Sequence, residues 1–254
     1  MSLALGIDIG GSGIKGAPVD LTTGEFVADR YRIPTPEKST PKNVAQVVGQ
    51  IAEHFDLPRH TPIGVAVPAP IVHGVAMWMA NLHKSWAGTN VDELFSNVLD
   101  TQVTVVNDAD AAGYGEVEYG AAKGQSGTSL VTTLGTGIGS ALVIDHRLIP
   151  NTELGHLTLP NGKEAEAWAS SAVKDRKKLS WTDWANRLQD VYGEYEKLLN
   201  PDLIIVGGGI SKDSDKFLPL LKTRVPIIPA TLRNKAGIIG AAALGAREAT
   251  SQNS

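Results

Sequence analysis

The 254-residue sequence contains no cysteine. This absence excludes a disulfide framework, a thiolate nucleophile and any zinc site built on cysteine ligands. Aromatic residues are scarce, at 6% of the chain. The longest weakly polar run, residues 236–246, is shorter than the roughly 18 residues needed to span a bilayer. We therefore expect a protein without membrane spans, located in the reducing environment of the cytoplasm.

The sequence also lacks an excess of positive charge, because 23 Lys and Arg face 27 Asp and Glu, for a formal net charge of −4. No global positive field attracts nucleic acid or acidic lipid, so any polyanion must bind a local basic patch. The first strand-like segment begins at Leu3, without the basic and apolar regions of a signal peptide. We expect neither a nucleic-acid partner nor a membrane partner.

Glycine, by contrast, is plentiful, and the first Gly-rich stretch is GIDIGGSGIKGA, residues 6–17. Gly11, Gly13 and Gly16 match the G-x-G-x-x-G dinucleotide pattern, and Lys15 suggests a P-loop. A dinucleotide-binding loop and a P-loop must each lead directly into a helix. Residues 16–33 instead predict strand, turn and strand, because Thr-Thr-Gly is a turn signal and the residues after it alternate in polarity. We therefore predict a β-hairpin whose glycines take positive φ and whose N–H groups can face an anion; the alternative is an ordinary Gly-rich hairpin.

A second stretch, residues 135–143, aligns without gaps on residues 11–19 at an offset of 124 residues. Strand-like segments flank it on both sides. Two similar hairpins half a chain apart indicate two related α/β lobes, unless the likeness of two short Gly-rich strings is chance.

The other segments fit alternating helices and strands. Spacing of apolar residues predicts a helix over 41–55 and a buried strand after it. An apolar strand stops at Asn107-Asp108 and leads into a helix, and a long amphipathic helix follows Ser180 as its N-cap. A last buried strand breaks into the triglycine 207–209, and residues 236–248 predict a helix of small residues.

Several motifs occur in one order along nearly the whole chain: DIGGSGIKGA, NDADAA, LGTGIGSA, NTELGH, PDLIIVGGGISK and AGIIGAA. Together they resemble the actin-like ATPase and sugar kinase superfamily, and within it the ROK sugar kinases, including those that use polyphosphate. The resemblance implies an α/β fold of two actin-like, ribonuclease-H-like lobes, with mixed sheets flanked by helices and an active-site cleft between the lobes. We expect lobes at 1–106 and 107–254, with the helix at about 236–249 packing back on the first.

The resemblance places phosphate groups of the donor on both glycine hairpins and adenosine on the triglycine. Asp8 is suited to hold Mg²⁺ or its waters, because a carboxylate cannot face a phosphate directly, and Lys15 offers a positive charge to phosphoryl oxygens. The phosphate residues implied are Asp8, Gly10, Gly11, Ser12, Gly13, Lys15, Gly135, Thr136 and Gly137, and the nucleotide residues are Gly207, Gly208 and Gly209.

Asp108 lies at the carboxyl end of a predicted strand, where α/β sheets place ligands. The resemblance makes it the general base that takes the proton of the sugar hydroxyl. The alternative is a helix N-cap, a structural role for which Asp110 competes. The sugar-binding residues implied are Asn81, Asn107, Asp108, Glu153, His156 and Glu166, whose amide, carboxylate and imidazole groups suit hydroxyl groups.

The chain departs from most ROK relatives in one respect, because the Cys-rich zinc loop after the histidine is missing. The sequence there is LTLPNGKEAEAWAS, and the other histidines, at positions 54, 60, 73, 83 and 146, lack metal-ligand spacing. We expect no zinc site.

The resemblance implies a glucokinase that uses polyphosphate, ATP or both with Mg²⁺ and makes glucose 6-phosphate, with mannose as a further acceptor to consider. Polyphosphate needs a series of cations, which Lys174 to Lys178 with Lys84, Lys123, Lys212 and Lys216 could supply unless they are a solvated helix face. An ATP-only kinase for fructose or an N-acetylhexosamine is the alternative.

Two non-enzymatic alternatives are a sugar-binding regulator and an actin-like filament protein. Only five residues precede Gly6, so we expect no DNA-binding helix-turn-helix ahead of the kinase fold. The family is often dimeric, and Trp181 and Trp184 could form an apolar dimer interface or belong to the core. We expect a homodimer.

Overall fold

The computed structural model describes residues 3–78 and 82–251. Contacts divide the chain into two units, the first comprising residues 1–115 and 235–254 and the second residues 116–234. The division falls within α3 (Asp108–Glu118), later than the boundary after residue 106 that we expected. Most of α3 belongs to the first unit because its small residues pack against the C-terminal helix α7 (Ala236–Ser251).

The first unit contains a mixed sheet in the order β3-β2-β1-β5-β8, with β4 paired to β2. β1 and β2 are antiparallel, whereas β1, β5 and β8 run parallel. The strands of this unit are β1 (Leu3–Ile9), β2 (Ile14–Asp20), β3 (Glu25–Phe26), β4 (Tyr31–Ile33), β5 (Ile63–Val67), β6 (Ile71–Val72), β7 (Val75–Ala76) and β8 (Val103–Asn107).

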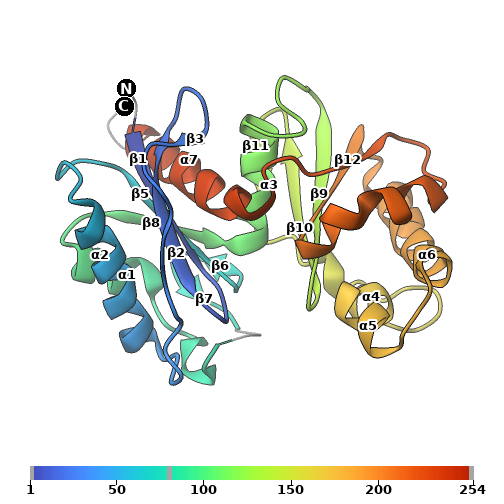
Figure 1. Cartoon of the computed structure of the whole chain (residues 1–254), viewed down its shortest axis with the longest axis horizontal. Helices are drawn as coiled ribbons and strands as arrows, with labels where there is room; N and C mark the ends of the chain where they lie inside the picture. Colours follow the sequence, from blue (N-terminus) through green and yellow to red (C-terminus); the bar gives the residue numbers. More distant parts are fainter. Residues whose placement is uncertain (1–2, 79–81, 252–254) are drawn as a thin grey trace. The chain divides into compact units, whose positions relative to one another are not determined.

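Two helices with well-defined caps cover one face of this sheet (Figure 1). Helix α1 (Pro41–Phe55) confirms the predicted span; Thr40 caps its N-terminus, and the left-handed Asp56 ends it. Helix α2 (Val91–Leu99) is capped by Asn90 and ends at the left-handed Asp100. The short 3-10 helix η1 (Lys84–Trp86) precedes α2 and places Trp86 in the core.

Helix α7 lies on the other face of the sheet, where glycine allows backbones to approach closely (Figure 1). A Cβ on Gly64 of β5 would overlap the carbonyl oxygen of Ala241. A Cβ on Gly240 would overlap the carbonyl oxygen of Ala111 in α3. The small-residue composition of α7 therefore follows from its packing against both a strand and a helix.

The second unit repeats the strand arrangement of the first, because its sheet has the order β11-β10-β9-β12-β13. Here too a hairpin of antiparallel strands leads through its first strand to two parallel neighbours. The strands are β9 (Thr128–Leu134), β10 (Ile138–Ile144), β11 (Arg147–Ile149), β12 (Leu203–Gly207) and β13 (Ile227–Pro229). The related lobes that we inferred from the two glycine hairpins are confirmed by this topology.

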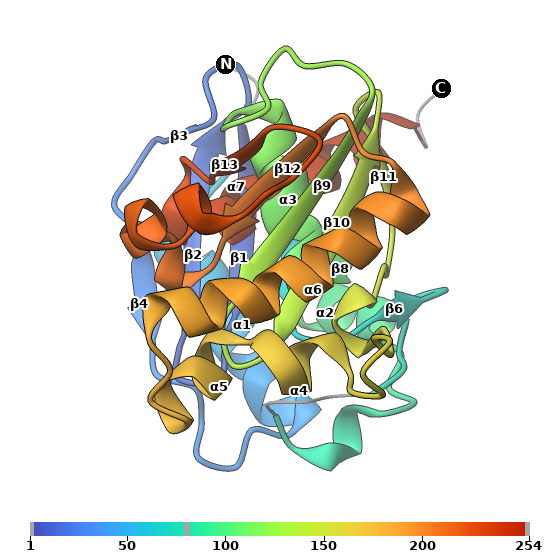
Figure 2. The ribbon, with the colours of Figure 1, turned by 90° about the vertical axis from the view of Figure 1, so that its right-hand side faces the viewer.

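Helix α6 (Trp181–Leu199) crosses one face of this sheet, as Figure 2 shows. Ser180 caps it as predicted, accepting from the backbone N–H of Asp183 at 3.0 Å. Trp184 is fully buried between α6 and the sheet, so it belongs to the core and not to an interface, whereas Trp181 is only partly buried. The remaining helices are α4 (Ala165–Ala169), α5 (Ser171–Arg176), η2 (Leu154–His156), η3 (Gly209–Lys216), η4 (Leu218–Leu220) and η5 (Arg233–Lys235), the last at the border of the units.

The two units together confirm the predicted α/β class with mixed sheets and flanking helices. Among the helices in residues 3–78 and 82–251, none is both long enough and apolar enough to cross a membrane.

Candidate active site

The first glycine hairpin joins β1 and β2, as predicted, and no helix follows it. The N–H of Gly10 donates to the carbonyl oxygen of Gly13 at 3.1 Å and closes the turn. Asp8 and Lys15 are register partners across the two strands, and the Lys15 Nζ atom lies 3.0 Å from Asp8 Oδ2. Both side chains remain partly accessible, so this pair places one negative and one positive group directly below the turn.

Two side chains that the sequence did not single out hold the same turn. Arg32 of β4 donates from Nη2 to the carbonyl oxygen of Ser12 at 2.7 Å, and Thr35 donates from Oγ1 to that of Gly10 at 2.5 Å. A Cβ on Gly13 would lie 2.5 Å from the Arg32 guanidinium. No sequence motif points to Arg32. It reaches the turn because β4 pairs with β2, where Arg32 lies opposite Lys15.

The expectation of positive φ at the hairpin glycines is wrong. None of the five glycines in the two turns lies in the left-handed region. Glycine at position 13 instead leaves room for the guanidinium of Arg32, which a Cβ there would displace.

Asp108 follows β8 directly and is the first residue of α3, at the carboxyl end of a parallel strand as predicted. In the parallel register Asp8 of β1 aligns with Ala66 of β5, and Ala66 aligns with Val106 of β8. Since neighbouring strands lie about 4.8 Å apart, the backbones of Asp8 and Val106 are separated by roughly 10 Å. Asp8, the predicted magnesium contact, and Asp108, the predicted general base, thus belong to the same edge of one sheet.

The N-cap of α3 is Asn107, and neither Asp108 nor Asp110, the two candidates considered from the sequence, takes this role. Asn107 Oδ1 accepts from the backbone N–H groups of Ala109 at 2.7 Å and Asp110 at 3.1 Å. The reason is that Asn107 still has extended conformation as the last residue of β8, which is the backbone geometry an N-cap requires. Its side-chain oxygen is therefore engaged in the helix, and Asp108 is not needed as a cap.

The second glycine hairpin joins β9 and β10 and is one residue shorter than the first. The N–H of Gly135 donates to the carbonyl oxygen of Gly137 at 3.0 Å. The carbonyl oxygen of Gly135 accepts from Ser171 Oγ at 2.9 Å and from the Ala172 N–H at 3.1 Å, so the start of α5 holds this turn.

Three predicted sugar residues meet beside the second hairpin. Glu166 Oε2 accepts from the N–H of Ile138 at 3.3 Å. His156 lies between two carboxylates, with Nδ1 3.9 Å from Glu166 Oε1 and Nε2 4.0 Å from Glu153 Oε2. The structure therefore brings Glu153, His156 and Glu166 together, although twelve residues separate the first from the last.

Burial raises the pKa of Glu153 above its ordinary value of 4.5. The charge of His156 opposes this rise, and the neighbouring carboxylate of Glu166 adds to it. A half-buried carboxyl with hydrogen-bonding groups on either side can accept and donate hydrogen bonds, which suits paired hydroxyls.

The triglycine ends β12 and begins η3, also within the second unit. Gly208 has φ of 84°, and a Cβ there would overlap the backbone of Leu134 at the end of β9. Ser211 Oγ donates to the carbonyl oxygen of Gly208 at 2.8 Å and stabilises the turn. This close approach fits the prediction of a third glycine loop. Asn81, the remaining predicted sugar residue, lies outside the described residues.

A model of one protein family, described as the ROK family, matches residues 4–169. The chain belongs to the ROK family. It is also 46% identical over 246 residues to a polyphosphate glucokinase of Mycobacterium tuberculosis, covering 96% of this chain and 92% of the relative. The polyphosphate glucokinase of Mycobacterium leprae is likewise 46% identical over 96% of this chain and 75% of its own length.

A solved structure gives a similar result for this ROK protein. The inorganic polyphosphate/ATP-glucomannokinase from Arthrobacter sp. strain KM is 48% identical, with a TM-score of 0.89 over 99% of this chain and all of that one. The ROK fold predicted from the motifs is confirmed.

Sequence reasoning also missed Glu164, which lies beside the candidate sugar residues. Its Oε2 lies 3.5 Å from Nδ1 of His156. Within the part of the chain that the structure describes, His156, Glu164 and Glu166 form a group of three possible metal ligands with atoms within 4.8 Å of one another. His156 thus has carboxylate neighbours from the segment that follows it, and the expectation that zinc is absent stays a prediction.

Proposed function

We propose that this ROK protein is a glucokinase that transfers the terminal phosphoryl group of inorganic polyphosphate or ATP to the 6-hydroxyl of glucose. The observation that carries the proposal is the 46% identity with a polyphosphate glucokinase over 96% of the chain. The Arthrobacter relative at 48% identity, an inorganic polyphosphate/ATP-glucomannokinase, supports both donors and makes mannose a second acceptor to test.

The proposed role of Asp108 is that of general base. Its carboxylate accepts the proton of the 6-hydroxyl while that oxygen forms its bond to the terminal phosphorus and the bridging P–O bond breaks, so that the shortened donor leaves with the electron pair. The position of Asp108 at the end of β8, with the capping role taken by Asn107, supports this assignment.

The proposed phosphate-binding groups are the turn residues of both hairpins and the ammonium of Lys15. Positive charge and backbone N–H groups stabilise the charge on the three transferring oxygens. Lys15 is held by Asp8 at 3.0 Å, so its position at the base of the turn is set before a donor binds. The turn itself is kept in place by Arg32 and Thr35, which donate to the carbonyl oxygens of Ser12 and Gly10.

Magnesium is the proposed cofactor, and the donor set of the first unit fits it. A single partly exposed carboxylate such as Asp8 is the typical protein contact of a Mg²⁺ ion that keeps most of its waters and binds phosphate oxygens. When bound, the ion would neutralise charge on the donor phosphates.

The proposed sugar-binding groups are Glu153, His156 and Glu166. The imidazole lies 3.9 and 4.0 Å from the two carboxylates, and all three side chains are partly exposed, so one sugar could contact them together. A site built from such polar groups rejects an analogue that lacks a hydroxyl, because a buried group would lose its partner. Asn81 and Asn107 remain proposed contacts, and Gly207, Gly208 and Gly209 remain the proposed adenosine loop.

Two further expectations remain predictions. A homodimer is expected from the resemblance, and a mass measurement in solution decides it. A cytoplasmic location is expected from the absence of cysteine, and fractionation of cells that produce the protein tests it.

The decisive experiment measures initial rates of hexose 6-phosphate formation from glucose with Mg²⁺, using either ATP or nucleotide-free polyphosphate as the only donor. Turnover with both supports the full proposal. Turnover with ATP alone contradicts polyphosphate use, and no turnover with either contradicts glucose as acceptor. A panel of mannose, fructose and N-acetylglucosamine then identifies the acceptor.

A further inference from the structure

Two basic segments of the second unit begin at the same place, the end of β9. Helix α5 starts where Ser171 and Ala172 bond to the carbonyl oxygen of Gly135. Helix η3 starts after Gly208, which packs on the backbone of Leu134. Both segments therefore lead away from the hairpin proposed to bind the terminal phosphates.

The two segments converge again on one aromatic ring, that of Trp181. The Lys174 ammonium of α5 lies 4.0 Å from the ring centroid, and the Lys216 ammonium of η3 lies 5.4 Å from it. The ring is held from below, because it stacks on the buried Phe217 at 6.1 Å and 10°. Trp181 thus fixes two cations from separate segments at one point of the surface.

The pKa of Asp213 in η3 also indicates that Lys174 of α5 lies near the lysines of η3. The hydrogen bond from Lys216, at 2.6 Å, is the largest cause that lowers the pKa of Asp213 below its ordinary value. The charges of Lys212 and Lys174 lower this pKa further. Lys174 also lies 3.6 Å from Asp175, so the two acidic side chains partner the inner lysines.

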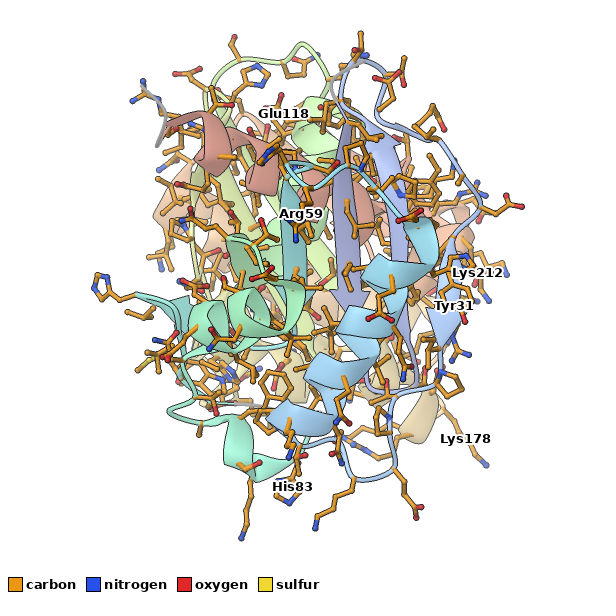
Figure 3. The ribbon with its side chains drawn as sticks, turned by 90° about the vertical axis from the view of Figure 1, so that its left-hand side faces the viewer. Tyr31, Arg59, His83, Glu118, Lys178 and Lys212 are labelled. Atoms are coloured by element: carbon orange, nitrogen blue, oxygen red, sulfur yellow. The ribbon has the colours of Figure 1, made fainter. Side chains whose placement is uncertain are left out.

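The outer cations are not neutralised in this way. Four exposed cations, none of which takes part in a salt bridge with any residue in the described ranges, make up this outer group: Arg176, Lys177, Lys178 and Lys212. Figure 3 shows the side chains of Lys178 and Lys212 extending away from the ribbon. Together with Lys174 and Lys216 they form what we call the α5–η3 basic strip, six cations on a chain whose net charge is −4.

We propose that the α5–η3 basic strip binds the inorganic polyphosphate chain beyond its terminal residues. This inference rests on the proposed function, because the terminal phosphates must lie at the Gly135 hairpin for the chain to continue along α5. Lys177 lies six residues after Ser171, roughly 9 Å along the helix direction. A linear polyanion can follow such a series of cations, whereas the three phosphates of ATP end near the hairpin.

The strip explains how the chain can favour a long polyanion despite its acidic composition. The segments 171–178 and 209–216 carry six basic and three acidic residues, so the positive charge is local. Of the lysines considered from the sequence, Lys84 and Lys123 lie on other segments, η1 and the loop after α3, and are not part of the strip.

The test uses the variant Lys177→Gln/Lys178→Gln/Lys212→Gln, which removes three exposed charges and no packed side chain. We expect the KM for long-chain polyphosphate to rise roughly tenfold, as the loss of three exposed charge contacts implies, with the KM values for ATP, tripolyphosphate and glucose unchanged. The slope of log KM against log salt should fall by about 0.7 for each lost contact, as for single-stranded nucleic acid. The control Lys42→Gln/Lys197→Gln/Lys222→Gln makes the same change of net charge at exposed lysines elsewhere.

A calorimetric titration of long-chain polyphosphate without sugar gives a readout independent of turnover. If the wild type neither binds nor uses polyphosphate, the proposed function fails. If it uses polyphosphate and the strip variant keeps the wild-type KM and salt slope, or if the control variant loses as much, the strip is overturned. Equal competition by single-stranded RNA of matched charge would overturn the assignment to polyphosphate.

Discussion

The carboxylate of Glu166 lies against the second glycine hairpin, where its Oε2 accepts from the N–H of Ile138 at 3.3 Å. A Cβ on the preceding residue, Gly137, would overlap that same oxygen. The hairpin and this proposed sugar-binding group are therefore in direct contact. A side chain at residue 137 would have to displace the carboxylate, whereas the backbone dihedral there does not demand glycine.

Gly137→Ala tests this relationship. The added methyl group must displace Glu166, so we expect the KM for glucose to rise at least tenfold while the fold is retained. The control is Gly193→Ala in α6, where no described atom outside its own helix lies within 4 Å of the new Cβ. Steady-state kinetics with varied glucose measures this KM. An unchanged KM would show that Glu166 does not contact the sugar.

Asp108→Asn tests the general base. The amide keeps the size and polarity of the side chain but cannot accept the proton, so kcat should fall by about 10² to 10⁴. Glucose binding, measured calorimetrically, should stay within about twofold of the wild type. The capping bonds of Asn107 leave α3 intact, and circular dichroism checks that. Near-normal kcat would remove Asp108 from the mechanism.

Asp8→Asn tests the magnesium contact. The substitution removes the negative charge, so the Mg²⁺ concentration for half-maximal rate should rise about tenfold with either donor, and the glucose KM should not change. The free energy of unfolding should change little, because the Asp8–Lys15 pair is partly exposed. Asp20→Asn, at the opposite end of β2, is the matched control. Equal Mg²⁺ dependence in the two variants would contradict the assignment.

Glu153 makes stability depend on pH. Because burial raises its pKa, the folded protein keeps the proton to higher pH than the unfolded chain. As pH rises between the ordinary value of 4.5 and the raised value, the unfolded chain loses its proton first, and the free energy of unfolding falls. At pH values above this window, Glu153→Gln should therefore have a higher Tm than the wild type. Below pH 4.5 this difference in Tm should disappear. Thermal melts across pH, with the exposed Glu248→Gln as control, test this; a pH-independent difference would refute it.

Gly240→Ala tests the packing of α7 on α3. Its Cβ would overlap the backbone oxygen of Ala111, which cannot move without the helix, so we expect a loss of about 1–3 kcal/mol in the free energy of unfolding. Gly193→Ala should instead gain roughly 0.5–1 kcal/mol, because alanine favours a helix interior and nothing obstructs it. Urea denaturation measures both. Equal effects would mean that the close approach of the two helices does not constrain residue 240.

The local features of the fold were predictable from the sequence because they depend on neighbouring residues. The Thr-Thr-Gly turn after β2 excluded a helix behind the first glycines, and apolar spacing with Thr40 and Ser180 as caps defined α1 and α6. The likeness of residues 135–143 to 11–19 predicted the repeated hairpin, and the end of an apolar strand placed Asp108. Such patterns express backbone preferences that act over a few residues.

Only the tertiary structure decided which distant residues meet. Arg32 reaches Ser12 because β4 pairs with β2, and Glu164 approaches His156 because α4 lies beside η2. The return of α7 to the first sheet depends on glycines that allow backbones to touch. These contacts follow from strand order and helix packing, which no stretch of sequence encodes by itself, and so the hairpins were read from the chain while the side chains that hold them were not.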